Sequence, residues 1–138
     1  MDSNKITPRV SKKTLFSTIW IFVVVNYLYC DVMSLMDPEL LSQYLAGNAG
    51  GMQITQGFLL GAAVLMEISM SMILLSRILS YKANRMANII AGAITTLVQI
   101  ATLFMGDASL YYIFFSIIEI AGTAAVLWMA IRWKNAED

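Results

Sequence analysis

The segment from Thr55 to Leu79 reads TQGFLLGAAVLMEISMSMILLSRIL. Glu67 is the only charged residue between Thr55 and Arg77, and most of its neighbours are apolar or small. About 20 predominantly apolar residues in a helix are enough to cross the hydrocarbon core of a bilayer. The segment therefore predicts a membrane-spanning helix.

Three further segments have the same length and character, so we expect an all-α integral membrane protein with four spans. Short connections join the second span to the third and the third to the fourth, which makes neighbouring helices antiparallel. The predicted fold is an up-down-up-down bundle over residues 14–133, between tails at 1–13 and 134–138. The expected spans cover residues 15–36, 55–79, 86–105 and 109–131.

The composition agrees with a protein that faces lipid. Apolar residues make up 59% of the 138 residues and charged residues 13%, whereas soluble domains average about 45–50% and about 25%. A net charge of zero gives no general attraction to nucleic acid. The chain has no histidine, and Cys30 is its single cysteine. We therefore expect no Cys/His metal site, no histidine-based catalytic triad and no cofactor.

The basic residues predict the orientation in the membrane. Four of the nine Lys and Arg residues precede the first span, three surround the connection between the second and third spans, and two follow the fourth. The other two connections contain none. Because short loops rich in Lys and Arg stay in the cytoplasm, we expect both termini to lie on the cytoplasmic side of the cell membrane.

The longest connection, residues 37–53, contains the signals of a short helix. Asp37 is a favourable capping residue, Pro38 suits the first helical position, and Glu39 complements the helix dipole. Apolar residues then recur at helical spacing until Gly47. We expect a helix at the membrane interface, followed by a flexible Gly50-Gly51 link. It either rests among the lipid headgroups or covers the outer mouth of the bundle as a lid.

Each predicted span places one strongly polar side chain near mid-depth, and such residues are expensive in lipid and usually face the bundle interior. The two glutamates lack a cationic partner at that depth, which favours the neutral carboxyl. A pocket is one interpretation, and an interhelical hydrogen-bond network is the other. The candidate substrate-binding residues are Asn26, Glu67, Gln99 and Glu119 in this layer, with Asp31, Tyr29, Tyr112 and Thr123 near it.

Three functions remain open on this basis. The first is binding or transport of a small lipophilic or cationic molecule, with Glu67 and Glu119 exchanging protons for it. The second is an enzyme that uses these glutamates as acid and base on a lipid-soluble substrate. We rank it lower because no nucleophile or metal motif accompanies them. The third is a non-catalytic membrane subunit or scaffold. Gly57 and Gly61 form a GxxxG pattern, which permits close helix approach within the bundle or in a homodimer.

The layout resembles small four-helix bacterial membrane proteins of the DoxX-like kind, and an uncharacterised bacterial family of that general type. The resemblance covers nearly the whole chain but implies no established activity. Redox-active members of such groups often rely on paired cysteines, so the single Cys30 argues against thiol redox chemistry here. The residues that carry the resemblance are Trp20, Asn26-Tyr27, Asp31, Asp37-Pro38, Glu67, Arg77, Asn84-Arg85, Asn88 and Glu119.

Overall fold

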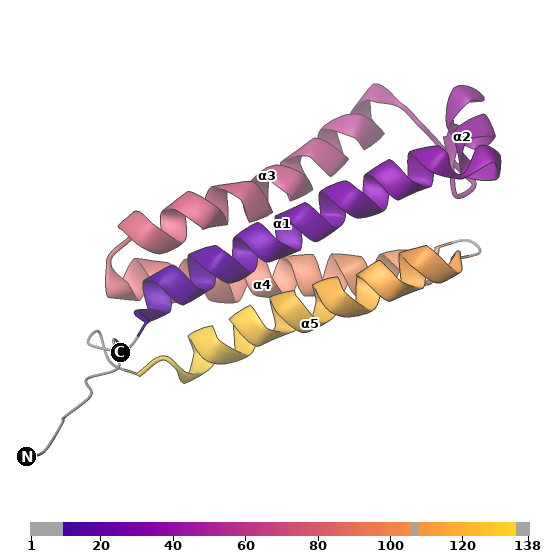
Figure 1. The fold of residues 1–138 in the computed structure, drawn as a ribbon. Coiled ribbons are helices and arrows are strands. Elements are labelled where there is room, and N and C mark those ends of the chain that lie inside the picture. Colours follow the sequence, from indigo (N-terminus) through magenta and orange to yellow (C-terminus); the bar gives the residue numbers. More distant parts are fainter. Residues whose placement is uncertain (1–9, 106–107, 135–138) are drawn as a thin grey trace, which may run out of the picture.

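The fold is known from a computed structural model that describes residues 10–105 and 108–134. Four long helices lie side by side, and a short helix and a two-stranded hairpin cover one end (Figure 1). The elements in chain order are α1 (Lys12–Met36), α2 (Pro38–Leu45), β1 (Asn48–Ala49), β2 (Met52–Gln53), α3 (Gln56–Ile78), α4 (Tyr81–Thr102) and α5 (Leu110–Arg132).

Three of these helices, α1, α3 and α5, are long and apolar enough to cross a membrane, which indicates a membrane protein. The remaining long helix, α4, begins at Tyr81 rather than near Met86, so the expected 81–85 turn is helical. The connection between α3 and α4 is thereby reduced to Leu79 and Ser80.

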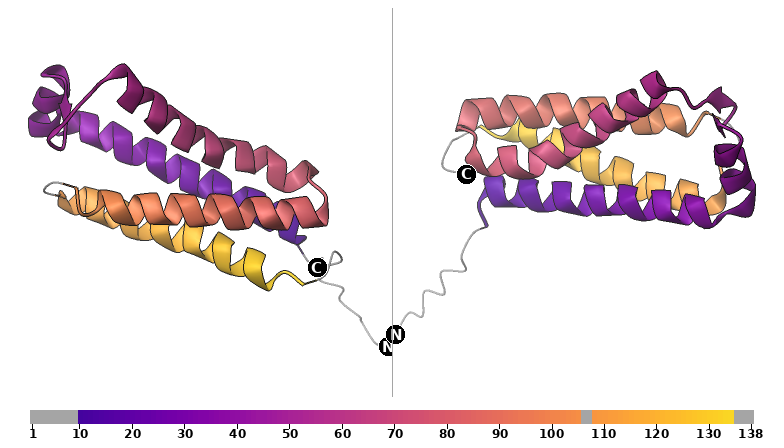
Figure 2. Two further views of the ribbon diagram at one scale, coloured as in Figure 1. Left: turned by 180° about the vertical axis from the view of Figure 1, so that it is seen from behind. Right: turned by 90° about the horizontal axis from the view of Figure 1, so that it is seen from above.

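Helix α1 packs against α3 and α5, and α5 packs along α4. The pair α3 and α4 meet at their shared turn and diverge from it, as Figure 1 and the left view of Figure 2 show. The close α4–α5 contact depends on Gly92, since a Cβ at this position would lie 3.2 Å from Leu127 Cβ and 3.3 Å from the Thr123 carbonyl oxygen.

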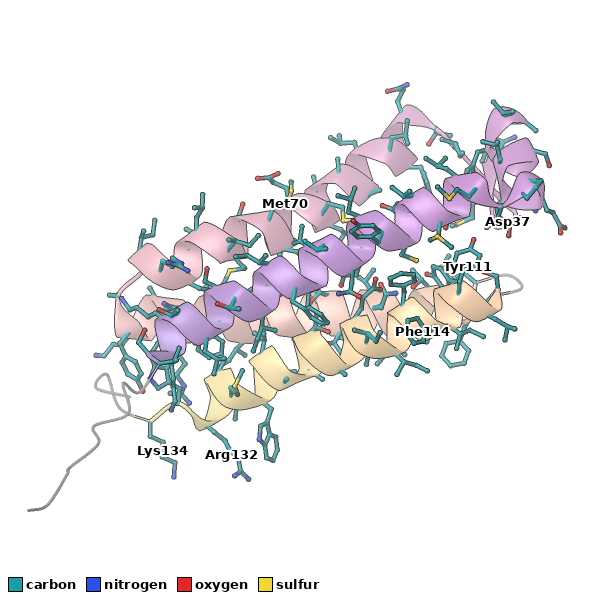
Figure 3. All side chains as sticks on the ribbon, in the orientation of Figure 1. Asp37, Met70, Tyr111, Phe114, Arg132 and Lys134 are labelled. Carbon is teal, nitrogen blue, oxygen red and sulfur yellow. The ribbon has the colours of Figure 1, made fainter. Side chains whose placement is uncertain are left out.

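We call the end where α1 begins and α5 ends the basic end. All described Lys and Arg residues lie near or just beyond helix ends there, and Figure 3 labels Arg132 and Lys134 among them. Lys13 donates to the carbonyl oxygen of Leu79 at the end of α3. Arg85 donates from Nε to the Ala130 carbonyl oxygen at 3.0 Å and from a terminal nitrogen to that of Ile131 at 3.1 Å. These cations satisfy carbonyl groups that a helix C-terminus leaves unpaired.

The interior near the basic end is filled by large side chains and a buried hydrogen-bond network. Trp20 Nε1 donates to Asn88 Oδ1 at 2.8 Å, and Asn88 Nδ2 donates to Asn84 Oδ1 at 2.7 Å. Ser76 joins α3 to the same cluster, because its hydroxyl lies 3.4 Å from Asn88 Nδ2. These four side chains are fully buried. Phe16, Met72, Ala91, Val126, Ala130 and Trp133 pack with Trp20 to form the apolar core.

The opposite end, which we call the hairpin end, carries α2 and the β1–β2 hairpin (Figure 1). Asp37, labelled in Figure 3, ends α1 and caps α2, with Oδ1 accepting from the Glu39 amide at 3.0 Å. The expected short helix is therefore present. The Gly50-Gly51 link is the turn of a hairpin, with φ values of 55° and 84°. Positive φ at both central residues is typical of a type I′ turn, which glycine adopts without strain.

Candidate functional site

A cavity of about 180 Å³ lies among the four long helices, on the hairpin side of the buried network. Each long helix contributes polar groups to its wall, and Ala62, Leu65, Met66 and Val98 supply apolar surface. The polar lining comprises Tyr27, Cys30 and Asp31 of α1, Ser69 of α3, Thr95 and Gln99 of α4, and Tyr112 and Glu119 of α5.

Glu119 is the most unusual group in this wall. Its side chain is only 1% exposed, and its Oε1 atom has no hydrogen-bond partner among the described residues. A buried polar group without a partner costs about 1–3 kcal/mol, and more when it is charged. The helix position explains its direction, because Ser116 and Thr123 precede and follow it at helical spacing and are also buried. Glu119 is therefore held facing the interior at the cavity.

Ser69 is a second unpaired group in the same cavity. Its side chain is fully buried, and its hydroxyl also has no hydrogen-bond partner among the described residues. Ser69 belongs to α3, whereas Glu119 belongs to α5, so the two groups enter the cavity from different helices. Buried polar atoms in proteins are usually paired. Two unpaired ones around one cavity are what a site for a polar ligand group requires.

Several other polar residues of α4 and α5 near the cavity have hydrogen-bond partners, either across the two helices or within one. Gln99 Nε2 donates to Ser116 Oγ at 2.9 Å, and Thr95 Oγ1 donates to the Ala91 carbonyl oxygen at 2.8 Å. Thr123 lies deeper, where its hydroxyl accepts from Thr96 at 2.8 Å. It joins α4 to α5 and is not part of the cavity wall. This part of the polar layer thus resembles the hydrogen-bond network that we considered beside a pocket.

Four of the eight predicted residues line the cavity, namely Asp31, Gln99, Tyr112 and Glu119. Asp31 remains exposed although it contributes to the wall, which places it at the rim. No described lysine or arginine lines the cavity. The described residues also include no group of three or more His, Cys, Asp or Glu that could hold a metal.

Glu67, Asn26 and Tyr29 do not line the cavity. Glu67 is exposed on the far side of α3, because the cavity-lining positions 62, 65, 66 and 69 occupy the opposite face of this helix. Asn26 is half-buried and donates to the Phe22 carbonyl oxygen of its own helix at 2.8 Å. Tyr29 is 60% exposed. We had expected the four mid-depth polar residues to form one inward-facing layer, and the structure shows that they do not.

Sequence reasoning missed Ser69 in particular. Leu65, Ser69, Met72 and Ser76 recur at helical spacing, and the last three are the buried residues of α3. The opposite face carries Ser71 beside Glu67, so serines occur on both sides and do not by themselves identify the inward one. We had expected Glu67 to face inward because ionisable residues are costly in lipid.

The hairpin end lies close to the rim of the cavity. Tyr111 is labelled in Figure 3. Its Oη lies 3.4 Å from Ser34 Oγ and connects α5 to α1 at the hairpin end. Burial raises the pKa of Tyr44 in α2, and Asp31 and Cys30 are near enough to raise it further electrostatically. Tyr44 therefore approaches two cavity-lining residues, although whether α2 acts as a lid stays a prediction.

Residues 6–138 match the model of a family of unknown function, DUF6326. No curated protein and no solved structure gives a significant match to the chain. These comparisons show no link to the DoxX-like proteins that the layout resembles. The match covers nearly the whole chain and extends through every helix described above.

Proposed function

The chain belongs to the DUF6326 family, and we propose that it is a four-span membrane protein that binds a small lipophilic molecule through a hydrogen-bond donor. The observation that carries this proposal is the unpaired Oε1 atom of Glu119, buried at a cavity that also contains the unpaired hydroxyl of Ser69. A ligand that donates to both groups would remove the cost of leaving them unpaired.

The fourth span in this proposal is α4, which has 22 residues. Its polar residues Asn84, Asn88, Thr95 and Gln99 are all buried. They lower the average hydropathy of the helix without facing lipid. The outward face is apolar and continuous, as an amphipathic helix with a lipid-facing stripe requires. This face is formed by Met86, Ile90, Ile94, Leu97 and Ile100, and Phe104 follows just beyond the end of the helix.

In the proposed orientation the basic end faces the cytoplasm of a cell membrane. The described cations at the ends of all four long helices support this orientation. The cavity then lies toward the external side, while the network of Trp20, Asn88 and Ser76 closes the cytoplasmic side. Access from outside or from the outer leaflet is therefore favoured. Transport would in addition require this network to open.

The size and charge of the cavity restrict the ligand. An apolar cavity of about 150 Å³ accommodates benzene, so about 180 Å³ accommodates a ring-sized group and not a whole lipid. Asp31 and Glu119 supply two carboxyls, and no described cation lines the wall. A lipophilic amine fits these properties better than an acid of the same shape. Exchange of the Glu119 proton for an ammonium group would make its binding proton-coupled.

The chain offers a matched control for the test. Glu119→Gln and Glu67→Gln make the same substitution at mid-helix positions, but only Glu119 lines the cavity. Each protein is purified in lipid nanodiscs, co-purified small molecules are identified by mass spectrometry, and benzylamine, benzyl alcohol and toluene are titrated by calorimetry. We expect wild type to prefer benzylamine, and Glu119→Gln to weaken it about tenfold to a hundredfold, as loss of a charged hydrogen bond implies.

Glu67→Gln should leave benzylamine binding unchanged. Equal binding of benzylamine and toluene by wild type would contradict the role of the carboxyl. Equal weakening by both substitutions would show that the effect does not come from the cavity. If the purified protein instead converts a co-purified lipid, and Glu119→Gln abolishes this turnover, an enzymatic function would replace binding. Asp31 would then take the role that we had expected for Glu67 as the second acid–base group, because Glu67 does not line the cavity.

A further inference from the structure

Glu67 lies in a place where a carboxyl group needs a partner. It is eleven residues from either end of α3, or about 16 Å at 1.5 Å per residue. Its side chain is exposed on the outside of the bundle. Ser71 Oγ donates to Glu67 Oε1 at 3.2 Å, within the same helix. A glutamate is too short to reach water from this depth, and ionisable residues in lipid cost several kcal/mol.

The surface around Glu67 has the spacing of a helix–helix interface. Five exposed positions and the half-buried Ser71 recur at alternating steps of four and three residues along α3, which is the repeat of two helices that pack in parallel with a left-handed crossing. Gly57 and Gly61 lie along one side of this surface, and a Cβ at Gly61 would meet nothing within 4 Å. We call this surface the Glu67 seam; it comprises Leu60, Val64, Glu67, Ser71, Leu74 and Ile78.

We propose that the Glu67 seam is the interface between two copies of this chain. Two copies inserted in the same orientation are related by an axis along the membrane normal, so their α3 helices run parallel. A two-fold axis places each seam position beside its own counterpart. Glu67 then faces the same carboxyl and the neighbouring serine of the other copy.

The chemistry of the seam favours a second copy over a partner with a cation. A protonated carboxyl donates one hydrogen bond and accepts others, and a serine hydroxyl does the same. Two Glu67–Ser71 pairs can therefore satisfy one another with one or both carboxyls protonated. The apolar seam positions are free to pack against their counterparts in a second copy, because Leu60, Leu74 and Ile78 are 66%, 68% and 73% exposed.

This interface is separate from the cavity. Ser69 and Leu65 face the cavity from the opposite side of α3, so a second copy on the seam leaves the cavity wall intact. The inference shares with the proposed function only the assignment of α3 as a span. It does not depend on a ligand at Glu119.

Cysteine cross-linking in native membranes tests the arrangement. Single cysteines replace Leu60, Val64 or Ser71 in a chain that carries Cys30→Ser. Leu59→Cys is the matched control, since Leu59 is 48% exposed, lies beside Leu60 in sequence and is turned about 100° from it around the helix. After oxidation we expect a disulfide-linked dimer at the three seam positions, several-fold more abundant than at position 59.

A second measurement uses the carboxyl itself. In the Val64→Cys background, Glu67→Leu should reduce the cross-linked fraction, whereas Glu67→Gln should retain it because an amide can pair with itself across the axis. Equal cross-linking at positions 64 and 59 would overturn the proposal, as would its absence at all seam positions in protein that is present in the membrane. Cross-linking of the seam to a different protein would also overturn it. Unchanged benzylamine binding in Glu67→Gln keeps the two proposals distinguishable.

Discussion

The buried network at the basic end makes a quantitative prediction for Asn88→Leu. This side chain accepts from Trp20 on α1 and contacts Ser76 on α3, so the substitution removes both links between helices. Interhelical hydrogen bonds in membrane proteins average about 0.6 kcal/mol, and an unpaired buried donor such as Trp20 Nε1 costs about 1–3 kcal/mol. The free energy of unfolding should therefore fall by about 2–4 kcal/mol.

Asn26→Leu is the control, because it makes the same change in a half-buried asparagine that bonds only within its own helix. We expect an effect below about 0.5 kcal/mol there. Both variants are unfolded by SDS titration in mixed micelles, followed by circular dichroism. A loss for Asn88→Leu no larger than that for Asn26→Leu would refute the view that this network holds the basic end together. A double-mutant cycle with Trp20→Phe should show non-additive losses.

Two further predictions concern packing and helix ends. Gly92→Ala should destabilise the protein by about 1–3 kcal/mol in the same SDS titration, because the new methyl would press on Leu127 and on backbone atoms. Gly61→Ala, which meets open space, should cause no loss in dilute detergent. Arg85→Gln should cost about 0.5–1 kcal/mol and lose this effect in high salt, since its cation interacts with the negative end of α5; Lys82→Gln at an exposed position serves as its comparison.

The polar faces of α4 and α5 were predictable from sequence. Asn88, Thr95 and Gln99 recur at helical spacing and are buried, as are Ser116 and Glu119. Both helices carry their polar residues in one stripe, and such a stripe identifies the interior of a membrane bundle because the lipid is apolar. These two helices supply Gln99, Tyr112 and Glu119, three of the four predicted residues that line the cavity.

The face of α3 was not predictable in the same way. Both of its sides combine apolar residues with a few small or polar ones, with Glu67 and Ser71 on one side and Ser69 and Ser76 on the other. Lipid tails are as apolar as a protein core, so hydrophobicity does not distinguish the two sides. Only tertiary packing decides the orientation. Glu67 does not follow the rule that an ionisable residue faces inward, and the proposed contact with a second copy would supply a physical reason for this.

The two-residue turn at Leu79 and Ser80 holds one end of α3 in place, so the helix can tilt only around that end. Lys13 and Arg77 fasten this helix to α1 beside the turn, whereas its other end, at Gln56, is about 33 Å away. A tilt of about 5° around the fastened end would displace Gln56 by about 3 Å. Helix tilt responds to the thickness of the hydrocarbon layer. In a bilayer that α3 spans, the width of the space between α3 and α4 would therefore depend on bilayer thickness, and a thinner or thicker membrane would adjust the cavity without any change in its residues.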